Sequence, residues 1–372
     1  MPELPEVETI RRSLETLILG CYIEELRLYD RRALLPEDKK DILLGSRMKI
    51  RALRRKGKYL LIDAADDNFD HSCTFLVHLR MTGRLIVRNL DEFPDYKTGL
   101  SILLSTSDTS IPPLPKFSSR FNYIGKYNRD SNKQLSLDTR KLLFMSRDEL
   151  ASPIFSSVDG NIVATLSDSL DQSDIEYFNQ IRAEALDNNT KVPLDASSDY
   201  LFLDFQDTRR FGSFQILPFQ GEEDSKSFKI LGVDAVSDEF TPAYFITHAR
   251  KHPKLNIKAF ILNQSVVAGF GNIYADETLF RAAILPTRLL SDLSDSELET
   301  IAILGKEILL ESIGFRGCSF RDYVDGLGNK GQFQYELKVY QREKQPCVKC
   351  STTIEKTVVA GRGTRFCPNC QK

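Results

Sequence analysis

The stretch Met1-Pro2-Glu3-Leu4-Pro5-Glu6-Val7-Glu8 opens the chain and predicts its first helix. The apolar residues that follow keep helical spacing: Val7, Ile10, Leu14, Leu17 and Ile18. Gly20 is expected to end this helix. Proline is tolerated in the first turn of a helix, where Pro2 and Pro5 are expected to lie. The sequence therefore predicts an amphipathic helix at the start of the fold.

The same stretch also carries groups with useful chemistry. Removal of Met1 would leave Pro2 as a secondary amine, and an α-amino group titrates near pH ~8, so part of it is an uncharged nucleophile at neutral pH. Glu3 and Glu6 are three residues apart and would share one helix face, where the helix dipole favours their ionised form. Proline and glutamate are also common at helix starts that have no catalytic role, and this stretch alone favours that interpretation.

Downstream of the helix, the sequence predicts short antiparallel strands. Strand-like patterns occupy residues 22–30, 47–65, 74–79 and 84–87. The basic turn Arg54-Arg55-Lys56-Gly57-Lys58 interrupts the second pattern, and Arg80-Met81-Thr82-Gly83 joins the last two. Short strands with glycine turns and no helices between them favour an antiparallel sandwich or barrel, with the first helix capping one side.

Residues 106–199 interrupt this pattern. They are rich in Ser, Asp and Asn, a composition typical of disordered chain, with one helical pattern over Asp171–Ala185. We interpret them as an insertion into a hairpin formed by residues 101–105 and 200–207, because closely spaced ends make a long insertion tolerable. Residues 91–200 hold 17 acidic and 11 basic residues, a net charge of −6, which leaves +4 for the rest of a chain of net charge −2. A mildly basic remainder suits a phosphate-binding surface.

After a linker over residues 220–235, the chain is predicted to be helical over residues 236–342. Typical helix starts occur at Thr241-Pro242 and at Ser294-Asp295-Ser296-Glu297. The turn Gly269-Phe270-Gly271-Asn272-Ile273-Tyr274 separates two further expected helices. Glycines let a backbone approach a phosphate closely, and the next helix offers free N–H donors. Such a turn standing alone is more often structural than ligand-binding.

Four of the seven cysteines lie near the C-terminus, as Cys347-x2-Cys350-x16-Cys367-x2-Cys370. This spacing is typical of a zinc ribbon, and four thiolates form a closed tetrahedral shell without an open catalytic position. We therefore expect one structural Zn²⁺ in a hairpin over residues 343–372. The other cysteines, Cys21, Cys73 and Cys318, are expected to be buried thiols rather than a disulfide framework.

Length and composition limit the class of protein. A chain of 372 residues is long enough for two or three domains with a sizeable core. No apolar run reaches the ~18–20 residues that a membrane span needs, and the N-terminus lacks the pattern of a secretory signal. We expect an intracellular protein, in the nucleus if the organism is a eukaryote and in the cytoplasm or nucleoid if it is a bacterium.

Taken together, the motifs resemble those of the formamidopyrimidine-DNA glycosylases. The stretch from Pro2 to Glu8 matches the signature of that family letter for letter. Further matches follow in the family's order: Lys58, His78–Gly83, Thr208–Gly212, Gly269–Tyr274, Gly317–Val324 and Arg362. The resemblance covers nearly the whole chain outside residues 106–199. It implies an α+β multidomain fold with a helix-capped antiparallel β-sandwich over residues 1–219, a helix–two-turn–helix domain over 236–342 and a zinc hairpin.

The resemblance implies roles for individual residues. Pro2 would be the nucleophile, Glu3 the general acid and base, and Glu6 the residue that helps to fix the site. Lys58, placed in the same catalytic set, would contact the phosphates beside the lesion. The implied DNA-contacting residues are Met81, Arg209, Phe211, Lys258, Asn272 and Arg362. Among these, Met81, Arg209 and Phe211 would fill the gap that an extruded nucleotide leaves.

Two positions depart from the family pattern. Arg80 stands where the family usually has glycine, and Cys318 and Ser319 stand where it commonly has two small hydroxyl residues. The first departure affects the tightness of the loop that carries Met81. The second affects lesion preference, because this segment is implied to lie over the extruded base.

The implied function is a bifunctional DNA glycosylase and AP lyase that removes oxidised purines, such as 8-oxoguanine and formamidopyrimidines, from duplex DNA. We expect a monomer that binds damaged duplex DNA and no membrane. One alternative is an endonuclease VIII-like enzyme for oxidised pyrimidines, and Leu4 argues against it because that branch usually has glycine there. The other alternative is a catalytically silent DNA-binding protein with a zinc hairpin. The presence of a matching residue at every catalytic position argues against it.

Overall fold

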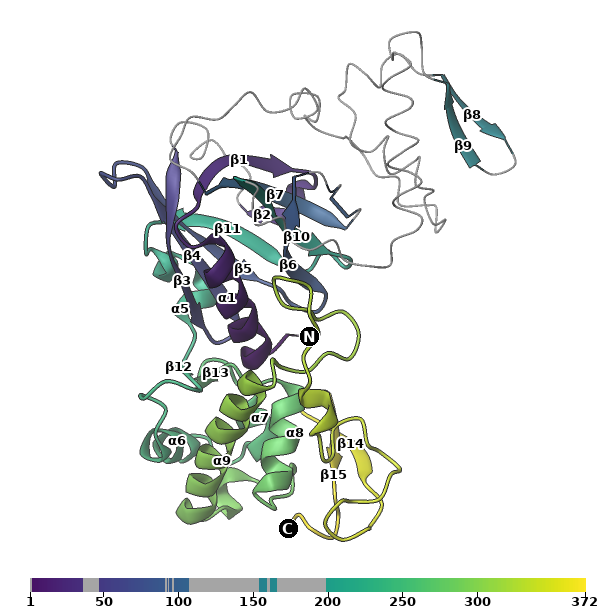
Figure 1. The fold of residues 1–372 in the computed structure, drawn as a ribbon. Helices are drawn as coiled ribbons and strands as arrows, with labels where there is room; N and C mark the ends of the chain where they lie inside the picture. The colour runs from purple at the N-terminus through teal and green to yellow at the C-terminus, as the bar shows by residue number, and fades with distance from the viewer. Residues whose placement is uncertain are drawn as a thin grey trace.

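The computed structural model describes residues 2–35, 47–90, 92, 94–95, 97–106 and 199–372, together with the backbone of residues 154–158 and 161–165. A lobe of β-strands lies next to a lobe of helices, and the N-terminus lies where they meet (Figure 1). The C-terminal hairpin of strands packs beside the helical lobe. Within the described ranges, no helix is both long and apolar enough to cross a membrane.

The predicted N-terminal helix is present as α1 (Leu4–Ile18). Glu3 is its N-cap residue, and the Glu3 N–H donates to the Glu6 carboxylate (Oε2) at 2.7 Å. Pro2 precedes the helix, so of the two prolines only Pro5 lies in the first turn. The helix ends before Gly20, whose φ of +83° is the left-handed conformation that glycine adopts without strain.

The strand lobe contains a sheet of nine strands in the order β2-β11-β5-β4-β3-β1-β7-β10-β6. Their bounds are β1 (Tyr22–Leu28), β2 (Leu34–Leu35), β3 (Met48–Lys56), β4 (Tyr59–Ala65), β5 (Ser72–His78), β6 (Gly83–Asn89), β7 (Thr98–Ser105), β10 (Tyr200–Asp207) and β11 (Ser213–Pro218). The pairs are antiparallel except β2–β11, which is parallel. The predicted antiparallel sandwich is therefore confirmed, with one parallel edge pair that was not expected.

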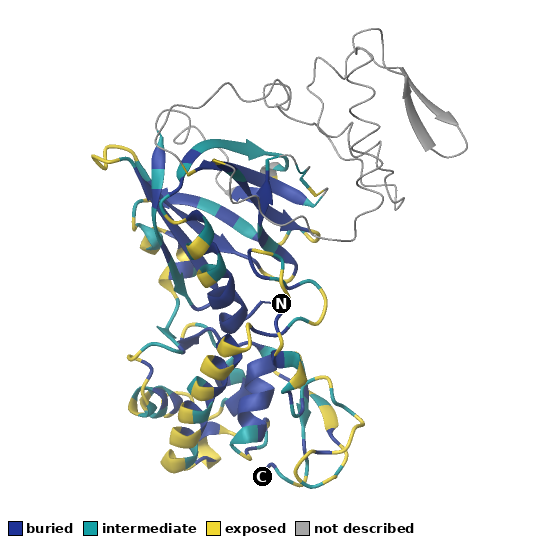
Figure 2. Cartoon of the chain, in the orientation of Figure 1, coloured by how far each residue is buried: buried dark blue, intermediate teal, exposed yellow. Residues whose placement is uncertain are grey.

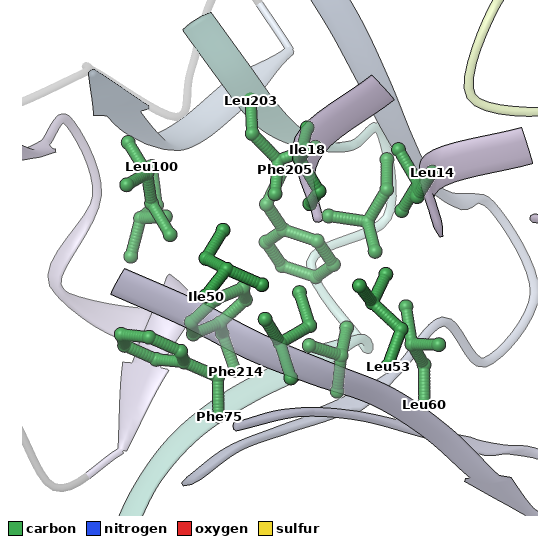
Figure 3. Close-up of a cluster of buried hydrophobic side chains, with 14 of the residues drawn as sticks. Leu14, Ile18, Ile50, Leu53, Leu60, Phe75, Leu100, Leu203, Phe205 and Phe214 are labelled. Carbon is green, nitrogen blue, oxygen red and sulfur yellow. The ribbon is translucent and has the colours of Figure 1, made fainter. Parts of the chain in front are cut away.

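One core holds the two halves of this sheet and α1 together. β1 pairs with β3 only at Tyr22 and Ile23 and then with β7 along its length, so the sheet folds over at β1. Side chains from both halves and from α1 meet in the space between them (Figure 3): Leu14, Ile18, Ile50, Leu53, Leu60, Phe75, Leu100, Leu203, Phe205 and Phe214. Burial of this apolar surface fixes the position of α1 and hence of the residues before it.

β7 and β10 are adjacent antiparallel partners, with Ser105 opposite Tyr200. The Thr106 N–H donates to the Asp199 carbonyl oxygen at 2.8 Å, which closes the base of the segment between them. The chain therefore leaves and re-enters the sheet at neighbouring positions, as expected for the hairpin interpretation. Of residues 107–198, the structure describes only the strand pair β8 (Ile154–Val158) and β9 (Asn161–Thr165). The predicted disorder and the helix over 171–185 lie outside the described residues.

The helical lobe consists of α6 (Pro242–Ala249), α7 (Ile257–Ile261), α8 (Asn272–Arg281) and α9 (Asp295–Gly314). Thr241 caps α6 and Ser294 forms a capping box with Glu297 at the start of α9, as predicted. The stretch predicted as a linker is more ordered than expected, because it holds η4 (Glu222–Asp224), α5 (Lys226–Lys229) and β12 (Val233–Asp234), which pairs with β13 (Val267–Ala268). The final hairpin is β14 (Glu355–Val359) and β15 (Arg362–Phe366).

Candidate active site

Glu3 lies between the two lobes, at the N-terminal end of α8. Its side chain is buried, and its carboxylate oxygens accept hydrogen bonds from the N–H groups of Gly271 (2.8 Å), Ile273 (3.0 Å) and Tyr274 (3.4 Å). These are free donors of a helix start and complement the negative charge. A Cβ at Gly271 would lie 2.2 Å from Glu3 Cδ, so glycine is required there. The helix start that the sequence suggested for a phosphate therefore holds Glu3.

Glu6 is buried one turn further along α1 and accepts three hydrogen bonds. Its Oε2 accepts from the Glu3 N–H at 2.7 Å, and its Oε1 accepts from the Tyr274 hydroxyl at 2.5 Å and the Cys318 N–H at 2.8 Å. Burial and the nearby Glu3 raise the pKa of Glu6, and its hydrogen bonds oppose this rise. Gly317, at a φ of +75°, packs so closely that a Cβ would lie 2.7 Å from Glu6 Oε1.

Lys58 reaches the same place from the turn between β3 and β4. The Lys58 ammonium (Nζ) donates to the Phe270 carbonyl oxygen at 2.7 Å, so it lies beside the turn that leads into α8. Burial lowers the pKa of Lys58, while the negative charges of Glu3 and Glu6 oppose the decrease. The structure thus brings Glu3, Glu6 and Lys58 together, and the buried residue Pro2 directly precedes Glu3.

The three predicted gap-filling residues lie on two adjacent loops of the strand lobe. Met81 and Phe211 are exposed to 44% and 62%, and the Arg209 guanidinium lies 3.5 Å from the Met81 sulfur. The buried Asp207 joins the loops, because its carboxylate accepts from the Thr82 hydroxyl at 2.5 Å and from the Arg209 N–H at 3.1 Å. Large apolar side chains are thus presented to solvent on a rigid base.

Arg80 adopts a φ of +54° in the first of these loops, a conformation in which glycine has no steric cost. Its N–H donates to His78 Nδ1 at 3.0 Å, which holds the loop to the end of β5. Burial lowers the pKa of His78 to about 3, so its imidazole is neutral and can accept this bond. The loop therefore forms with arginine in the position where glycine was expected.

Lys258, predicted to contact DNA, is buried in this structure rather than exposed to solvent. Its side chain is 0% exposed, and its ammonium (Nζ) donates to the Asp276 carboxylate at 2.5 Å and the Thr364 hydroxyl at 2.7 Å. A buried lysine needs such partners because an unpaired charge in the interior is very unfavourable. Lys258 therefore joins α7 and α8 to β15 of the C-terminal hairpin.

Asn272 and Arg362 lie near each other in the chain's tertiary structure. The Asn272 side-chain amide (Nδ2) donates to the Gly363 carbonyl oxygen at 2.9 Å, directly after Arg362. Arg362 is exposed at the start of β15, and its positive charge contributes to lowering the pKa of Lys58. The first residue of α8 and the turn of the hairpin are therefore held side by side.

The four C-terminal cysteines converge as their spacing predicts. The sulfur atoms of Cys347, Cys350, Cys367 and Cys370 all lie within 4.8 Å of one another, with separations of 3.8 Å for Cys347–Cys370 and 3.4 Å for Cys350–Cys367. A tetrahedral ZnS4 centre with Zn–S bonds of ~2.3 Å requires sulfur separations of about 3.8 Å, which this cluster fits. The cluster is a structural zinc site, since four thiolates complete the shell.

Sequence reasoning missed several buried polar residues that hold the site together. Arg55 joins the lobes by ion pairs to Glu8 (3.0 Å) and Asp234 (2.5 Å). The Glu277 carboxylate accepts from the N–H groups of residues 338, 339 and 340 and so fixes the chain that leads to the hairpin. Their sequence signal is weak, because a charged residue on a helix or strand is usually solvated; only the run Asp276-Glu277 within an otherwise buried helix could have indicated them.

Domain models of one family match three parts of the chain. The formamidopyrimidine-DNA glycosylase N-terminal domain matches residues 1–127, the H2TH domain of the same enzymes matches 231–324, and a zinc finger found in FPG and IleRS matches 344–372. A formamidopyrimidine-DNA glycosylase of Listeria monocytogenes is 30% identical over 375 residues, with both chains fully covered. That of Carboxydothermus hydrogenoformans is 32% identical over 378 residues, again with full coverage of both.

A solved structure shows the same arrangement. The complex of a Lactococcus lactis FPG variant with DNA that contains Fapy-dG aligns with a TM-score of 0.67 at 26% identity, and the alignment covers both chains completely. The order of sandwich, helical lobe and zinc hairpin, the buried glutamates at the lobe boundary and the full-length relatives agree with one another. The chain belongs to the formamidopyrimidine-DNA glycosylase family of DNA repair enzymes.

Proposed function

We propose that this protein is a bifunctional DNA glycosylase and AP lyase that removes oxidised purines from duplex DNA, with Pro2 as its nucleophile. The observation that carries the proposal is the convergence of Glu3, Glu6 and Lys58 next to Pro2 at the boundary of the lobes. Relatives support the substrate class: the Lactococcus lactis structure contains Fapy-dG, and a MutM structure contains a carbocyclic 8-oxo-G.

In the proposed first step, the Pro2 amine attacks C1′ of the damaged nucleoside and the C1′–N bond to the base breaks. An α-amino group has a pKa of ~8, so a usable fraction is unprotonated at neutral pH once Met1 is removed. Glu3 directly follows Pro2 and takes up or returns the proton that moves between amine, sugar oxygen and base. The N–H groups of α8 hold this carboxylate in one position, which orients it without further reorganisation.

A secondary amine gives a cationic iminium once the sugar ring opens, and this acidifies the neighbouring C–H bonds. Loss of a proton from C2′ expels the 3′ phosphate, and loss of a second proton, from C4′, expels the 5′ phosphate. Hydrolysis of the iminium then frees Pro2, so no redox cofactor is required. Lys58 is buried beside this centre, and we assign its ammonium to the phosphates that flank the lesion.

We further propose that one monomer binds damaged duplex DNA between its lobes. Residues 1–219 form the catalytic domain with the insertion 106–199, 236–342 form the helical DNA-binding domain, and 343–372 form the zinc hairpin. The exposed side chains Met81, Arg209 and Phe211 enter the gap left by the extruded nucleotide, because unstacking a base requires a replacement for its lost contacts. Asn272 and the exposed Arg362 contact the phosphate backbone.

Borohydride trapping on a duplex with 8-oxoguanine opposite cytosine tests this proposal, because borohydride reduces the iminium to a stable covalent bond. We expect a trapped complex that disappears when the N-terminus is blocked. Intact mass must first show that Met1 is removed. A correctly processed protein that binds the duplex but gives no trapped complex would support the catalytically silent alternative.

The same assay separates purine from pyrimidine lesions. A Lactococcus lactis Fpg structure with DNA that contains an oxidized pyrimidine keeps the second substrate class open for relatives. We expect faster excision of 8-oxoguanine than of thymine glycol from otherwise identical duplexes. Faster excision of thymine glycol would favour the endonuclease VIII-like function instead.

A further inference from the structure

The hydroxyl of Tyr274 lies at a buried point where three other elements meet. It is 2.5 Å from Glu6 Oε1 on α1, 2.6 Å from Ser312 Oγ on α9 and 3.6 Å from the Cys318 sulfur after α9. The Tyr274 side chain is 0% exposed, and its main-chain N–H also donates to Glu3 at 3.4 Å. This one residue of the helical lobe therefore contacts both Glu3 and Glu6.

The direction of these hydrogen bonds follows from the chemistry of a phenol. A tyrosine hydroxyl has a single proton, and a carboxylate oxygen is a better acceptor than a hydroxyl or a thiol. Tyr274 therefore donates to Glu6, and Ser312 donates to Tyr274. Burial and the charge of Glu6 raise the pKa of Tyr274 well above its usual range, so the phenol keeps its proton at neutral pH.

The Glu6 carboxylate, held by Tyr274, in turn fixes two other segments of the chain. Its Oε2 holds the Glu3 N–H at 2.7 Å, which fixes the peptide group between Pro2 and Glu3. Its Oε1 holds the Cys318 N–H at 2.8 Å, which fixes the start of the loop over residues 317–332. Gly317 packs directly on the carboxylate, so this loop has little freedom to shift against Glu6. One carboxylate thus links the N-terminal residue to the loop.

We infer that Tyr274 is a positioning residue: its hydroxyl fixes the carboxylate of Glu6 and thereby sets the orientation of the Pro2 amine and the start of the 317–332 loop. This inference rests on the proposed function, in which Pro2 is the nucleophile. Without the hydroxyl, Glu6 keeps two N–H donors and stays in place, but its carboxylate can rotate. Misplacement of a reacting group by ~1 Å can slow a reaction by about a hundredfold.

Tyr274→Phe tests the inference, because it removes only the hydroxyl and keeps the ring against Phe333, with a centroid separation of 6.0 Å. The test uses the zinc-loaded full-length protein with a processed N-terminus. We expect the single-turnover rate of borohydride trapping on an abasic-site duplex to fall about ten- to a hundredfold. The Kd for a duplex with an uncleavable abasic analogue should change by less than about threefold, because the fully buried Tyr274 offers DNA no surface to contact.

Ser312→Ala is the matched control. It removes the buried Ser312 hydroxyl, which forms a hydrogen bond with the Tyr274 phenol. Ser312 forms no hydrogen bond with Glu6 among the described contacts. We expect its trapping rate to stay within about threefold of wild type. Equal slowing of both variants would assign the effect to general packing and overturn the inference. A wild-type trapping rate in Tyr274→Phe would also overturn it.

Two further results separate this inference from the proposed function. If Tyr274→Phe does not fold, Glu6→Gln replaces it: the amide cannot satisfy all three donors of Glu6, so trapping should slow similarly, and an unchanged rate would overturn the inference. If the wild-type protein itself gives no trapped complex, the proposed function is wrong and the inference falls with it. Wild-type trapping combined with an unaffected Tyr274→Phe would remove only the inference.

Discussion

The N-terminal site and the gap-filling loops solve opposite problems in one molecule. Glu3 and Glu6 are exposed to 2% and 1%, and each accepts three hydrogen bonds. Met81 and Phe211 are exposed to 44% and 62%. Figure 2 shows the N-terminal end of α1 in the colour of buried residues where the two lobes meet. Groups proposed for chemistry are fixed by the protein, whereas groups proposed to enter DNA are left without apolar cover.

The difference has a physical reason. A proton-transfer group must be oriented before the reaction, so hydrogen bonds to a helix start are well suited to hold it. A residue that enters a base stack gains its contacts only from DNA, so the free protein must leave it exposed and position its backbone instead. Asp207 does this by bonding both loops from below. Substitutions in the first region should therefore change the rate of the chemical step. Substitutions in the second should change how well the protein distorts the duplex.

The largest expected effect is that of Glu3→Gln. An amide keeps the shape of the side chain but cannot act as a base, so single-turnover excision should fall by about 10²- to 10⁴-fold. Glu15→Gln, on the same helix but 40% exposed, is the control and should leave the rate unchanged. A Glu3→Gln variant with near-normal excision would show that the buried site is structural, and the comparison between the regions would fail.

Phe211→Ala should slow excision from duplex DNA by about ten- to a hundredfold, because filling the stack offsets an unstacking cost of a few kcal/mol. Its free energy of unfolding should change by less than about 0.5 kcal/mol, since the ring is mostly exposed. Phe69→Ala, an exposed aromatic at the opposite end of β5, is the control for loss of a surface ring. A loss of stability without a loss of rate would contradict the assignment of Phe211 to DNA.

The base of the first loop should be sensitive to acid. Because burial lowers the pKa of His78 to about 3, the unfolded chain takes up a proton near pH 6.5 while the folded protein does not. The contribution of His78 to the free energy of unfolding is therefore fully present above pH ~6.5. It should fall by about 1.4 kcal/mol per pH unit between pH ~6.5 and ~3. Urea unfolding at several pH values, compared between wild type and His78→Gln, measures this slope.

The exposed His71 provides the control for that measurement. His78→Gln should flatten the pH dependence, and His71→Gln controls for the loss of an imidazole at an exposed position. Identical slopes in wild type and His78→Gln would show that His78 does not hold the loop as a neutral acceptor.

The smallest effect is expected for Arg80→Gly. A φ of +54° costs an ordinary residue ~1–2 kcal/mol, and the extra entropy of unfolded glycine offsets about half of that. The variant should be more stable by up to about 1 kcal/mol, read as a small rise in Tm. Arg84→Gly, in the neighbouring strand β6, lacks this strain and should instead lower the Tm. A destabilised Arg80→Gly would mean that the arginine side chain itself holds the loop.

Much of the fold could be predicted because its signals are local. The apolar spacing of residues 7–18 and Gly20 predicted α1, and Thr241 and Ser294 predicted two helix starts. Alternation predicted most strands of the sandwich but not the parallel pairing of β2 with β11, since register with a distant edge strand leaves no local pattern. The segment 220–235 was predicted as a plain linker because its two short helices are below the length at which periodicity is visible.

The residues of the site could be predicted from the sequence, but the contacts between them could not. Lys258 shows the limit: a lysine on a helix is usually solvated, and nothing in the sequence indicates that Asp276, 18 residues away, and Thr364, 106 residues away, enclose it. The tertiary structure places this residue, predicted to contact DNA, in a buried ion pair with Asp276. Asp207 and Glu277 were missed for the same reason, since most of their partners are main-chain N–H groups that almost any residue could supply.

By itself, the sequence determined the N-terminal helix with Glu3 and Glu6 at its start and the four zinc thiolates, because capping, periodicity and ligand spacing act over a few residues. Only the tertiary structure decided that Glu3 binds the start of α8, 268 residues away, and that Tyr274 meets Glu6. Those contacts exist because the core between the sheet halves fixes α1, and the helical lobe then closes on its N-terminal end. Hydrogen bonds between distant segments depend on that packing, which no local pattern records.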